Sequence, residues 1–272
     1  MLCLTVFAFH PPISRALTLI LPKTAYQGDL ILGYTDANAD VRLQDTVLPV
    51  DPRGHFVLAV PRNQKTDLKV TARSADNAVS RLIRIWAYPW RIQSIKGLPK
   101  RYVTPNAAQL ARIQADAQTV RAVRNRPPST MPLFIENGFI QPVAGKVSGI
   151  FGSQRILNGI PRSPHSGVDI AAPEGTPVHC PANGIVTLTA ENMFLMGNTL
   201  MVDHGLGVSS IFIHLKRFRV RPGDRVFQGD VIADVGKTGR ATGAHLHWGV
   251  SVGKVAVDPL RLLKQRFDVS GG

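Results

Sequence analysis

Short apolar runs separated by turn residues fill the chain from about residue 14 to residue 95. They are rich in β-branched and aromatic residues, and Gly, Pro, Asp and Asn punctuate them, as in the Asp51-Pro-Arg-Gly54 segment. The clearest runs lie at residues 17–21, 30–32, 55–60 and 82–86. This spacing predicts a small β-sandwich-like domain over residues 14–98, with no motif that fixes its topology and no catalytic group of its own.

A helical period replaces the strand pattern after Thr104. The apolar positions recur at the spacing of one helix face, at Leu110, Ile113, Ala117 and Val120. Thr104 and Pro105 predict the start, because Thr suits the capping position and Pro suits the first turn. The Pro127-Pro128 pair predicts the end. We expect one amphipathic helix and a Pro-containing linker over residues 99–138, with arginines on the solvated face.

Strands return after Phe139, in a stretch rich in glycine and proline. The apolar runs lie at residues 184–188, 199–203 and 208–215. The segment His204-Gly-Leu-Gly207 predicts a hairpin between the last two runs, and no helix is indicated before Pro259. Regular glycines between short strands predict a tightly turned antiparallel β-domain over residues 139–264 and a tail over residues 265–272. The predicted fold class is therefore mainly β.

Length and charge narrow the functional classes. A chain of 272 residues is long enough for two domains. Its formal net charge of +14 and sequence pI of about 10.5 favour polyanionic partners such as nucleic acid, anionic lipid or an acidic cell-wall polymer. The chain lacks a block of consecutive Lys or Arg and an aromatic RNA-binding signature. Nucleic acid is therefore not expected as a partner.

The first residues, Met1-Leu-Cys-Leu-Thr-Val-Phe-Ala-Phe9, are apolar, and no Lys or Arg precedes them. They predict a truncated secretory signal over residues 1–13, and hence an exported protein of the periplasm or cell envelope; an ordinary first strand is the alternative. No apolar run is long enough to predict a membrane-spanning helix. Because Cys3 lies in this segment, an intramolecular disulfide is not expected. Cys180 is predicted to be a small buried hydrophobe, with a zinc ligand as the alternative.

Four of the eight histidines and one aspartate fall in three short motifs of the C-terminal stretch. The motifs are His165-Ser-Gly-Val-Asp169, Phe212-Ile-His214-Leu and His245-Leu-His247-Trp. Neutral imidazoles and a carboxylate are ligands that zinc accepts when cysteine is not used. Zinc hydrolysis also needs an open position and a group that handles protons. Histidines left off the metal can act as base or oxyanion donor, and the spacing alone leaves that assignment open.

Strand geometry predicts how these side chains meet. Residues two apart on a strand point to one face, so His245 and His247 are expected to project together. By the same rule, His214 is expected to share a face with Ser210 and Phe212. The signal from each motif alone is weak, because alternating histidines also occur on ordinary strands. Three such motifs in one β-domain strengthen the prediction of a metal site.

The first motif contains a glycine between its two candidate ligands. Gly167 is predicted to permit a bend that brings His165 and Asp169 together. Three of the four other histidines are predicted to be surface or packing residues, namely His55, His179 and His204.

The segment from His165 to Val178 resembles the first signature of the M23 family of zinc metallopeptidases, the lysostaphin and LytM type. Further matching segments follow in the family's order: Gly184-Ile-Val186, Gly197-Asn198, His204-Gly205, His214-Leu215, Val220-x-x-Gly-Asp-x-Val226 and Gly236-Lys-Thr-Gly-Arg-Ala-Thr-Gly-Ala-His-Leu-His247. The resemblance covers roughly residues 139–264. It is specific, because the order, the spacing and the flanking glycines all agree.

The resemblance places the family's zinc ligands on His165, Asp169 and His247 and its two catalytic histidines on His214 and His245. It implies a C-terminal M23 peptidase domain with zinc as cofactor and peptidoglycan as partner. The implied function is an endopeptidase that hydrolyses amide bonds in peptidoglycan stem peptides or cross-bridges. The N-terminal domain would then position the enzyme or bind an envelope protein partner.

Two other classes compete with this interpretation. A non-catalytic, cell-wall-binding regulator of amidases is disfavoured because all five functional positions of the family are present. A carrier of the lipoyl type is suggested by the turns of residues 220–231, but it would need a modifiable lysine at a hairpin tip, and none is found there.

The chain departs from the family pattern at a few positions. Residues 150–164 contain no tyrosine, Phe212 stands where Tyr is frequent, and Trp248-Gly249 follows the His-x-His motif in place of an aromatic residue and Glu. These changes affect details of transition-state binding and leave the five functional positions intact. Arg155 is left with two interpretations, a contact with a substrate carboxylate or a structural salt bridge.

Overall fold

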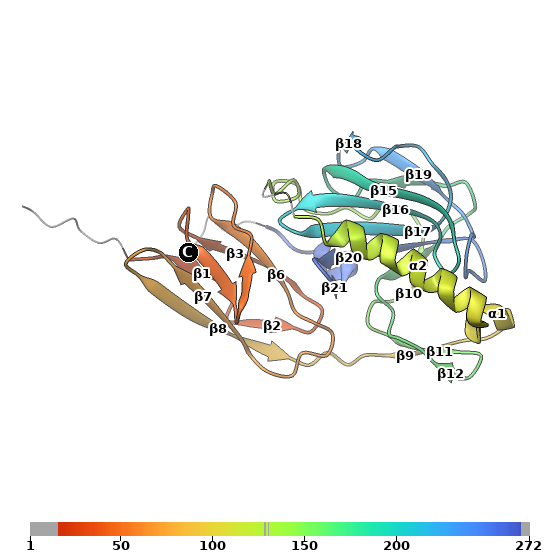
Figure 1. Cartoon of the computed structure of the whole chain (residues 1–272), viewed down its shortest axis with the longest axis horizontal. Helices are drawn as coiled ribbons and strands as arrows, with labels where there is room; N and C mark the ends of the chain where they lie inside the picture. The colour runs from red at the N-terminus through yellow and green to blue at the C-terminus, as the bar shows by residue number, and fades with distance from the viewer. Residues whose placement is uncertain (1–15, 128, 130, 268–272) are drawn as a thin grey trace, which may run out of the picture.

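The computed structural model describes residues 16–127, 129 and 131–267. The predicted signal over residues 1–13, Cys3, Pro128 and residues 268–272 of the predicted tail lie outside these described residues. Two β-rich domains lie beside each other, and a long helix runs along the second one (Figure 1). The mainly β fold predicted from the sequence is confirmed.

The N-terminal domain is a sandwich of two sheets. One sheet has the order β1-β3-β6, and the other has the order β2-β8-β7-β4-β5. Their strands are β1 Leu19–Ile20, β2 Thr24–Tyr26, β3 Leu30–Thr35, β4 Asp40–Leu43, β5 Thr46–Leu48, β6 His55–Ala59, β7 Leu68–Arg73 and β8 Ala78–Trp86. The pairing is antiparallel except between β2 and β8. The predicted β-sandwich is present.

The sheet β1-β3-β6 is covered on both faces. Along β6, Phe56 and Leu58 enter the core of the sandwich, whereas Val57 and Ala59 belong to the core of the C-terminal domain. A strand buried on both sides needs an uninterrupted apolar run instead of an alternating one, and β6 has such a run. The two domains therefore share an apolar interface.

The chain leaves the sandwich through β9, Ile92–Ile95. This strand pairs in parallel with β11, Gln154–Leu157, and the hairpin partner of β11 is β12, Ile160–Pro161. Residues up to 98 were predicted to belong to the N-terminal domain. In the structure, the end of that range forms a sheet with a hairpin of the C-terminal domain, a long-range pairing that a short run such as Ile92–Ile95 does not reveal.

Two helices follow, α1 at Lys100–Val103 and α2 at Ala107–Arg124. The predicted start of α2 was wrong: the N-cap is Asn106, whose side chain accepts a hydrogen bond from the backbone N–H of Gln109. The Gln109 side chain accepts in return from the N–H of Asn106, which completes a capping box. Among the described residues, no helix combines the length and apolar character needed to cross a membrane.

The C-terminal domain is an antiparallel sheet with the order β10-β13-β20-β17-β16-β15-β18, to which β14, β19 and β21 add further pairs. The strands are β10 Lys146–Gly149, β13 Val168–Ala171, β14 Pro177–His179, β15 Gly184–Met193, β16 Gly197–Gly205, β17 Val208–Phe218, β18 Arg225–Val226, β19 Val231–Val235, β20 His245–Val252 and β21 Val255–Val257. A short helix, α3 Pro259–Leu262, ends the domain.

The predicted hairpin joins β16 to β17 through Leu206 and Gly207. Both residues have positive φ, 49° and 77°, as a two-residue type I′ turn requires. Leu206 is nonetheless buried in the apolar core. The turn therefore fixes the register of β17, the strand that carries His214.

Candidate active site

Successive side chains of the strand β20 point alternately into the apolar core and towards the site. Leu246 and Trp248 are fully buried in the apolar core. His245 and His247 point to the other face, as predicted, where Asp169 on β13 is the register partner of His247. The sheet thus brings two motifs of the sequence together.

The predicted face of His214 was wrong. Ser210 and Phe212 are fully buried on the core side, whereas His214 lines a cavity with Ile213 and His247. His214 has a positive φ of 65°, and the ladder between β17 and its neighbours shifts register there. This irregularity turns the imidazole away from the core. Because Phe212 faces the core, the replacement of the family's Tyr by Phe does not remove a hydroxyl group from the site.

Three side chains converge closely enough to hold one metal ion. His165 Nε2 lies 2.8 Å from His247 Nδ1 and 3.0 Å from Asp169 Oδ1, and the last two atoms are 2.8 Å apart. All three residues are buried. Ligands about 2.1 Å from a tetrahedral zinc lie roughly 3.4 Å apart, so this triangle needs to open only slightly to accept the ion.

The hydrogen bonds around the triangle also fit a metal. His165 Nδ1 lies 3.1 Å from the carbonyl oxygen of Ile150. A carbonyl can only accept, so His165 carries its proton on Nδ1 and presents a lone pair on Nε2. Burial lowers the pKa of His165 to about 4, which keeps the ring neutral. A neutral imidazole is the form that binds a metal ion.

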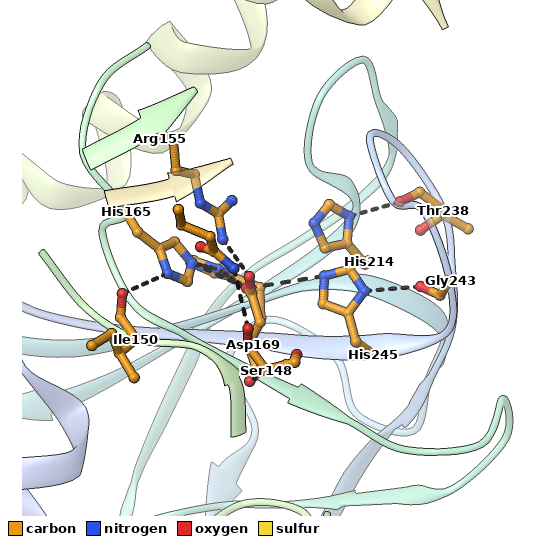
Figure 2. A network of polar contacts seen from close by, with 11 residues as sticks. Ser148, Ile150, Arg155, His165, Asp169, His214, Thr238, Gly243 and His245 are labelled. Atoms are coloured by element: carbon orange, nitrogen blue, oxygen red, sulfur yellow. Dashed lines mark hydrogen bonds and ion pairs between the residues drawn. The ribbon is translucent and has the colours of Figure 1, made fainter. Parts of the chain in front are cut away.

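Asp169 is the charged member of the triangle. Its burial alone would raise its pKa, but its contacts with His165 and His247 bring the pKa below the ordinary value. Its Oδ2 atom is held by Arg155 Nη2 while Oδ1 faces the imidazoles (Figure 2). Of the two interpretations left open for Arg155, the structure shows the salt bridge.

Two further imidazoles lie beside the triangle. The rings of His214 and His245 have centroids 4.7 Å apart. Figure 2 shows both rings next to Asp169, each anchored through Nδ1: His214 donates to the carbonyl of Thr238 at 2.7 Å and His245 to that of Gly243 at 2.9 Å. In the neutral form of each ring, the lone pair is therefore on Nε2. Burial, followed by the charges of His245 and His247, lowers the pKa of His214 to about 3.

Glycines allow the backbone to approach these side chains. A Cβ on Gly149 would lie 2.6 Å from Asp169 Oδ2, and one on Gly167 would lie 2.3 Å from the carbonyl oxygen of Trp248. Gly167 lies at a bend between His165 and Asp169, as predicted, although its φ is not positive. It is required because β13 and β20 lie too close together there for a side chain.

Two cavities adjoin the histidines. The smaller has a volume of about 290 Å³ and borders on β9, Arg155 and His245. The larger, about 560 Å³, extends between α2 and β17 and reaches His165 and His247. Both are lined by His214 and Arg240. A bound chain that crosses the site would therefore pass these two side chains.

Several groups at this site were not predicted from the sequence. Thr238 orients His214, and Arg240 lies at the junction of the two cavities. Both belong to the long glycine-rich motif that ends at His247, which was the only signal that could have singled them out. The apolar wall that α2 contributes could not be located, because it depends on how the helix docks.

Among the described residues, the three other histidines and Cys180 take structural roles, as predicted; the histidines are His55, His179 and His204. His204 is fully buried, with Nδ1 donating to the carbonyl of Asn183 and Nε2 placed 2.8 Å from Ser210 Oγ. Cys180 is also fully buried, and burial raises its pKa to about 12, so it is a packing residue.

The triangle of His165, Asp169 and His247 could hold one metal ion, with His214 and His245 beside it, and known proteins share a related domain. The family model "Peptidase family M23" matches residues 163–259. Residues 163–259 therefore correspond to a domain of peptidase family M23, a family of zinc-dependent peptidases.

Curated relatives agree with this assignment. Over 96 residues, the chain is 41% identical to the DD-carboxypeptidase/endopeptidase Mpg of Neisseria meningitidis serogroup B. The matched region covers 35% of this chain and 22% of that protein. The chain is 38% identical over 90 residues to the peptidoglycan DD-endopeptidase ShyA of Vibrio cholerae, over 33% of this chain and 21% of that protein. The chain thus spans about a fifth of the length of the curated relatives it matches.

The two-domain architecture also has a solved counterpart. The crystal structure of an M23 peptidase from Pseudomonas aeruginosa matches with a TM-score of 0.69 and 28% identity, over 88% of this chain and 94% of that one. The match therefore extends beyond the peptidase domain into the N-terminal sandwich.

Proposed function

We propose that the protein is a zinc-dependent endopeptidase that hydrolyses amide bonds in peptidoglycan stem peptides or cross-bridges. The observation that carries the proposal is the convergence of five side chains from three separate motifs. Three of them form the metal triangle, and the other two lie beside it with their Nε2 lone pairs unused by the protein's carbonyls.

His165, Asp169 and His247 are the residues that would hold the ion. When bound, zinc supplies a Lewis acid that polarises the scissile carbonyl and lowers the pKa of water. The salt bridge from Arg155 leaves one oxygen of Asp169 for the metal. The Nδ1 bond of His165 to Ile150 fixes the ring so that Nε2 faces the site.

His214 and His245 divide the proton handling between them. His214 is buried and neutral, and its Nδ1–H is committed to Thr238, so its Nε2 is suited to accept a proton from water. His245 has more contact with solvent, with a side chain 17% exposed. Once its ring has taken up a proton, His245 could donate from Nε2 a hydrogen bond to the oxyanion or a proton to the leaving amine.

The basic balance of the chain suits the same substrate. Peptidoglycan carries free carboxylates, and a net charge of +14 attracts such a polymer. Location in the periplasm or cell envelope and an envelope protein partner for the N-terminal domain remain predictions that accompany this function. A non-catalytic regulator of amidases is the competing proposal, and the intact set of five residues speaks against it.

Product analysis tests the proposal. Zinc-loaded protein is incubated with defined cross-linked muropeptides, and the products are identified by mass spectrometry. We expect cleavage of an amide bond that a chelator abolishes, zinc restores and His214→Ala suppresses. Binding to the muropeptides without cleavage by the zinc-loaded protein would favour the regulator.

A further inference from the structure

The two cavities beside the histidines contain an excess of positive charge. Among their lining residues, four are arginines and two are aspartates. The arginines are Arg124, Arg155, Arg162 and Arg240, and the aspartates are Asp116 and Asp169. The excess is present before any metal is bound, so the lining of the site favours an anionic ligand.

Most of the charged groups near the triangle already have partners. Arg155 holds Asp169, and Arg162 donates to the carbonyl of Val103. Asp116 accepts a hydrogen bond from the N–H of Phe194 at 2.6 Å. Neither aspartate is therefore left to neutralise a further arginine.

Arg240 differs from Arg155 and Arg162, and it differs from Arg124, which also lacks a partner among the described residues, in that Arg124 borders only the larger of these two cavities. The Arg240 guanidinium makes no hydrogen bond and no ion pair with any residue of the described ranges, although its backbone N–H is bonded to Leu195. Burial, followed by the charges of Arg155 and Arg162, lowers its pKa, and the charge of Asp169 acts in the opposite direction. Arg240 is thus a half-buried cation without a partner, and two other cations lie next to it. A ligand could provide the counter-charge that it lacks.

The position of Arg240 indicates where on a bound peptide that counter-charge would lie. Arg240 borders both cavities, and so does His214. Because Arg240 and His214 line the same two cavities, a group of a bound peptide that reaches Arg240 lies close to the bond that faces His214. The fork of a guanidinium matches the two oxygens of a carboxylate.

We propose that Arg240 is a specificity-determining residue that binds a free carboxylate of the peptide substrate close to the scissile amide. The inference rests on the proposed function and deepens it. The sequence had suggested a contact with a substrate carboxylate for Arg155, and we assign this contact to Arg240 instead. The enzyme would then prefer peptides with a free acid at this position over the corresponding amides.

The test uses matched substrates and matched variants. A series of defined stem peptides has each free carboxylate replaced in turn by a carboxamide, and kcat and KM are measured with zinc-loaded wild type, Arg240→Gln and Arg240→Lys. Arg121→Gln is the control, because Arg121 is an exposed residue of α2 whose side chain bonds only to its own helix, and its loss changes the net charge equally.

For wild type, we expect one amide replacement to lower kcat/KM about 10- to 100-fold, mainly through KM. Arg240→Gln should lower kcat/KM for the acid peptide by a similar factor and leave the amide peptide unchanged. Arg240→Lys should recover part of the loss, and Arg121→Gln should resemble wild type. Equal losses of Arg240→Gln on acid and amide peptides, or a wild type indifferent to every amide, would overturn the inference.

A binding measurement separates this inference from the proposed function. Calorimetry of the same peptides with zinc-loaded His214→Ala, and with His214→Ala combined with Arg240→Gln, requires no turnover. If wild type cleaves none of the peptides, the proposed function fails, but a preference for the acid peptide that disappears with Arg240 still supports the inference. Equal binding of acid and amide peptides contradicts it.

Discussion

Two buried aspartates, one in each domain, pair with a histidine four residues away along the chain. Asp51 of the N-terminal sandwich is 3% exposed, and its Oδ1 accepts hydrogen bonds from the N–H groups of Arg53 and His55. Asp169 of the peptidase domain is 8% exposed, and its partners include His247 and Arg155 from distant segments.

Asp51 and Asp169 differ in the groups that contact their carboxylate oxygens. The oxygens of Asp51 are taken by its own turn and by His55, so the pair stabilises the local backbone. Asp169 Oδ1 instead faces two imidazoles that have no role in the local turn. The spacing of a histidine and an aspartate therefore does not identify chemistry, whereas convergence of separate strands on one oxygen does.

The largest expected effect comes from removing the carboxylate of the site. Asp169→Asn should lower zinc content well below one ion per chain and reduce peptide hydrolysis by about 10,000-fold or more, since the metal and its activated water are lost together. Metal analysis and product release measure both quantities. The matched control is Asp51→Asn, which should lose stability but keep its zinc and its turnover. Loss of zinc from Asp51→Asn would remove the contrast between the two pairs.

The next largest effect concerns the imidazole that stays off the metal. His214→Ala should reduce kcat about 100- to 10,000-fold and leave the zinc content near that of wild type, because this ring acts on protons and not as a ligand. Parallel metal and rate measurements separate it from Asp169→Asn. A variant that loses zinc and activity together would show that His214 is a ligand.

A core substitution in the sandwich should affect stability alone. Phe56 is fully buried between the two sheets, and Phe56→Ala should cost about 3–5 kcal/mol of unfolding free energy. Denaturant unfolding gives this value, and kcat of the remaining folded enzyme should stay unchanged. A fall in kcat at a temperature where the variant is folded would mean that the sandwich participates in chemistry.

Acid should weaken the peptidase domain through a histidine that is not part of the site. Burial lowers the pKa of His204 from 6.5 to about 4, so the unfolded chain binds the proton first as the pH falls. The neutral, buried ring of His204 therefore contributes fully to the stability of the folded state above about pH 6.5. This contribution, up to about 3 kcal/mol, is lost as the pH falls towards 4. Thermal unfolding of wild type and His204→Gln across this window measures it. We expect the unfolding temperature of the variant to fall less steeply with decreasing pH than that of wild type. Parallel curves of unfolding temperature against pH would contradict the assignment of this effect to His204.

The smallest effect belongs to the surface charge. Binding of the protein to purified cell wall should weaken several-fold between low and high salt, because exposed charges more than about 10 Å apart are screened at 0.1 M salt. Sedimentation with the cell wall across a salt series measures it. Retention that does not change with salt would show that the charge of +14 is incidental.

The motifs predicted the residues of the site better than their surroundings. Alternation along β20 was sufficient to place His245 and His247 on one face. His214 was placed on the wrong face because its positive φ comes from a bulge between paired strands, which no local pattern records. The N-cap of α2 was misplaced because Asn106 and Gln109 form a reciprocal cap that competed with Thr104 and Pro105.

The contacts between separate segments were beyond local reasoning. The apolar run of β6 predicted a strand, but not that its second face would cover the peptidase domain. The unpartnered Arg240 could not be inferred either, since it depends on which acids are already engaged by Arg155 and by Phe194. Such features arise only when the strands are assembled.

X-ray diffraction from crystals of the zinc-loaded protein, recorded on both sides of the zinc absorption edge, tests the central claim most directly. We expect one anomalous peak among His165 Nε2, Asp169 Oδ1 and His247 Nδ1, with the rings of His214 and His245 beside it and no fourth protein ligand. A peak at another place, or a fourth side chain that closes the coordination of the ion, would contradict this claim.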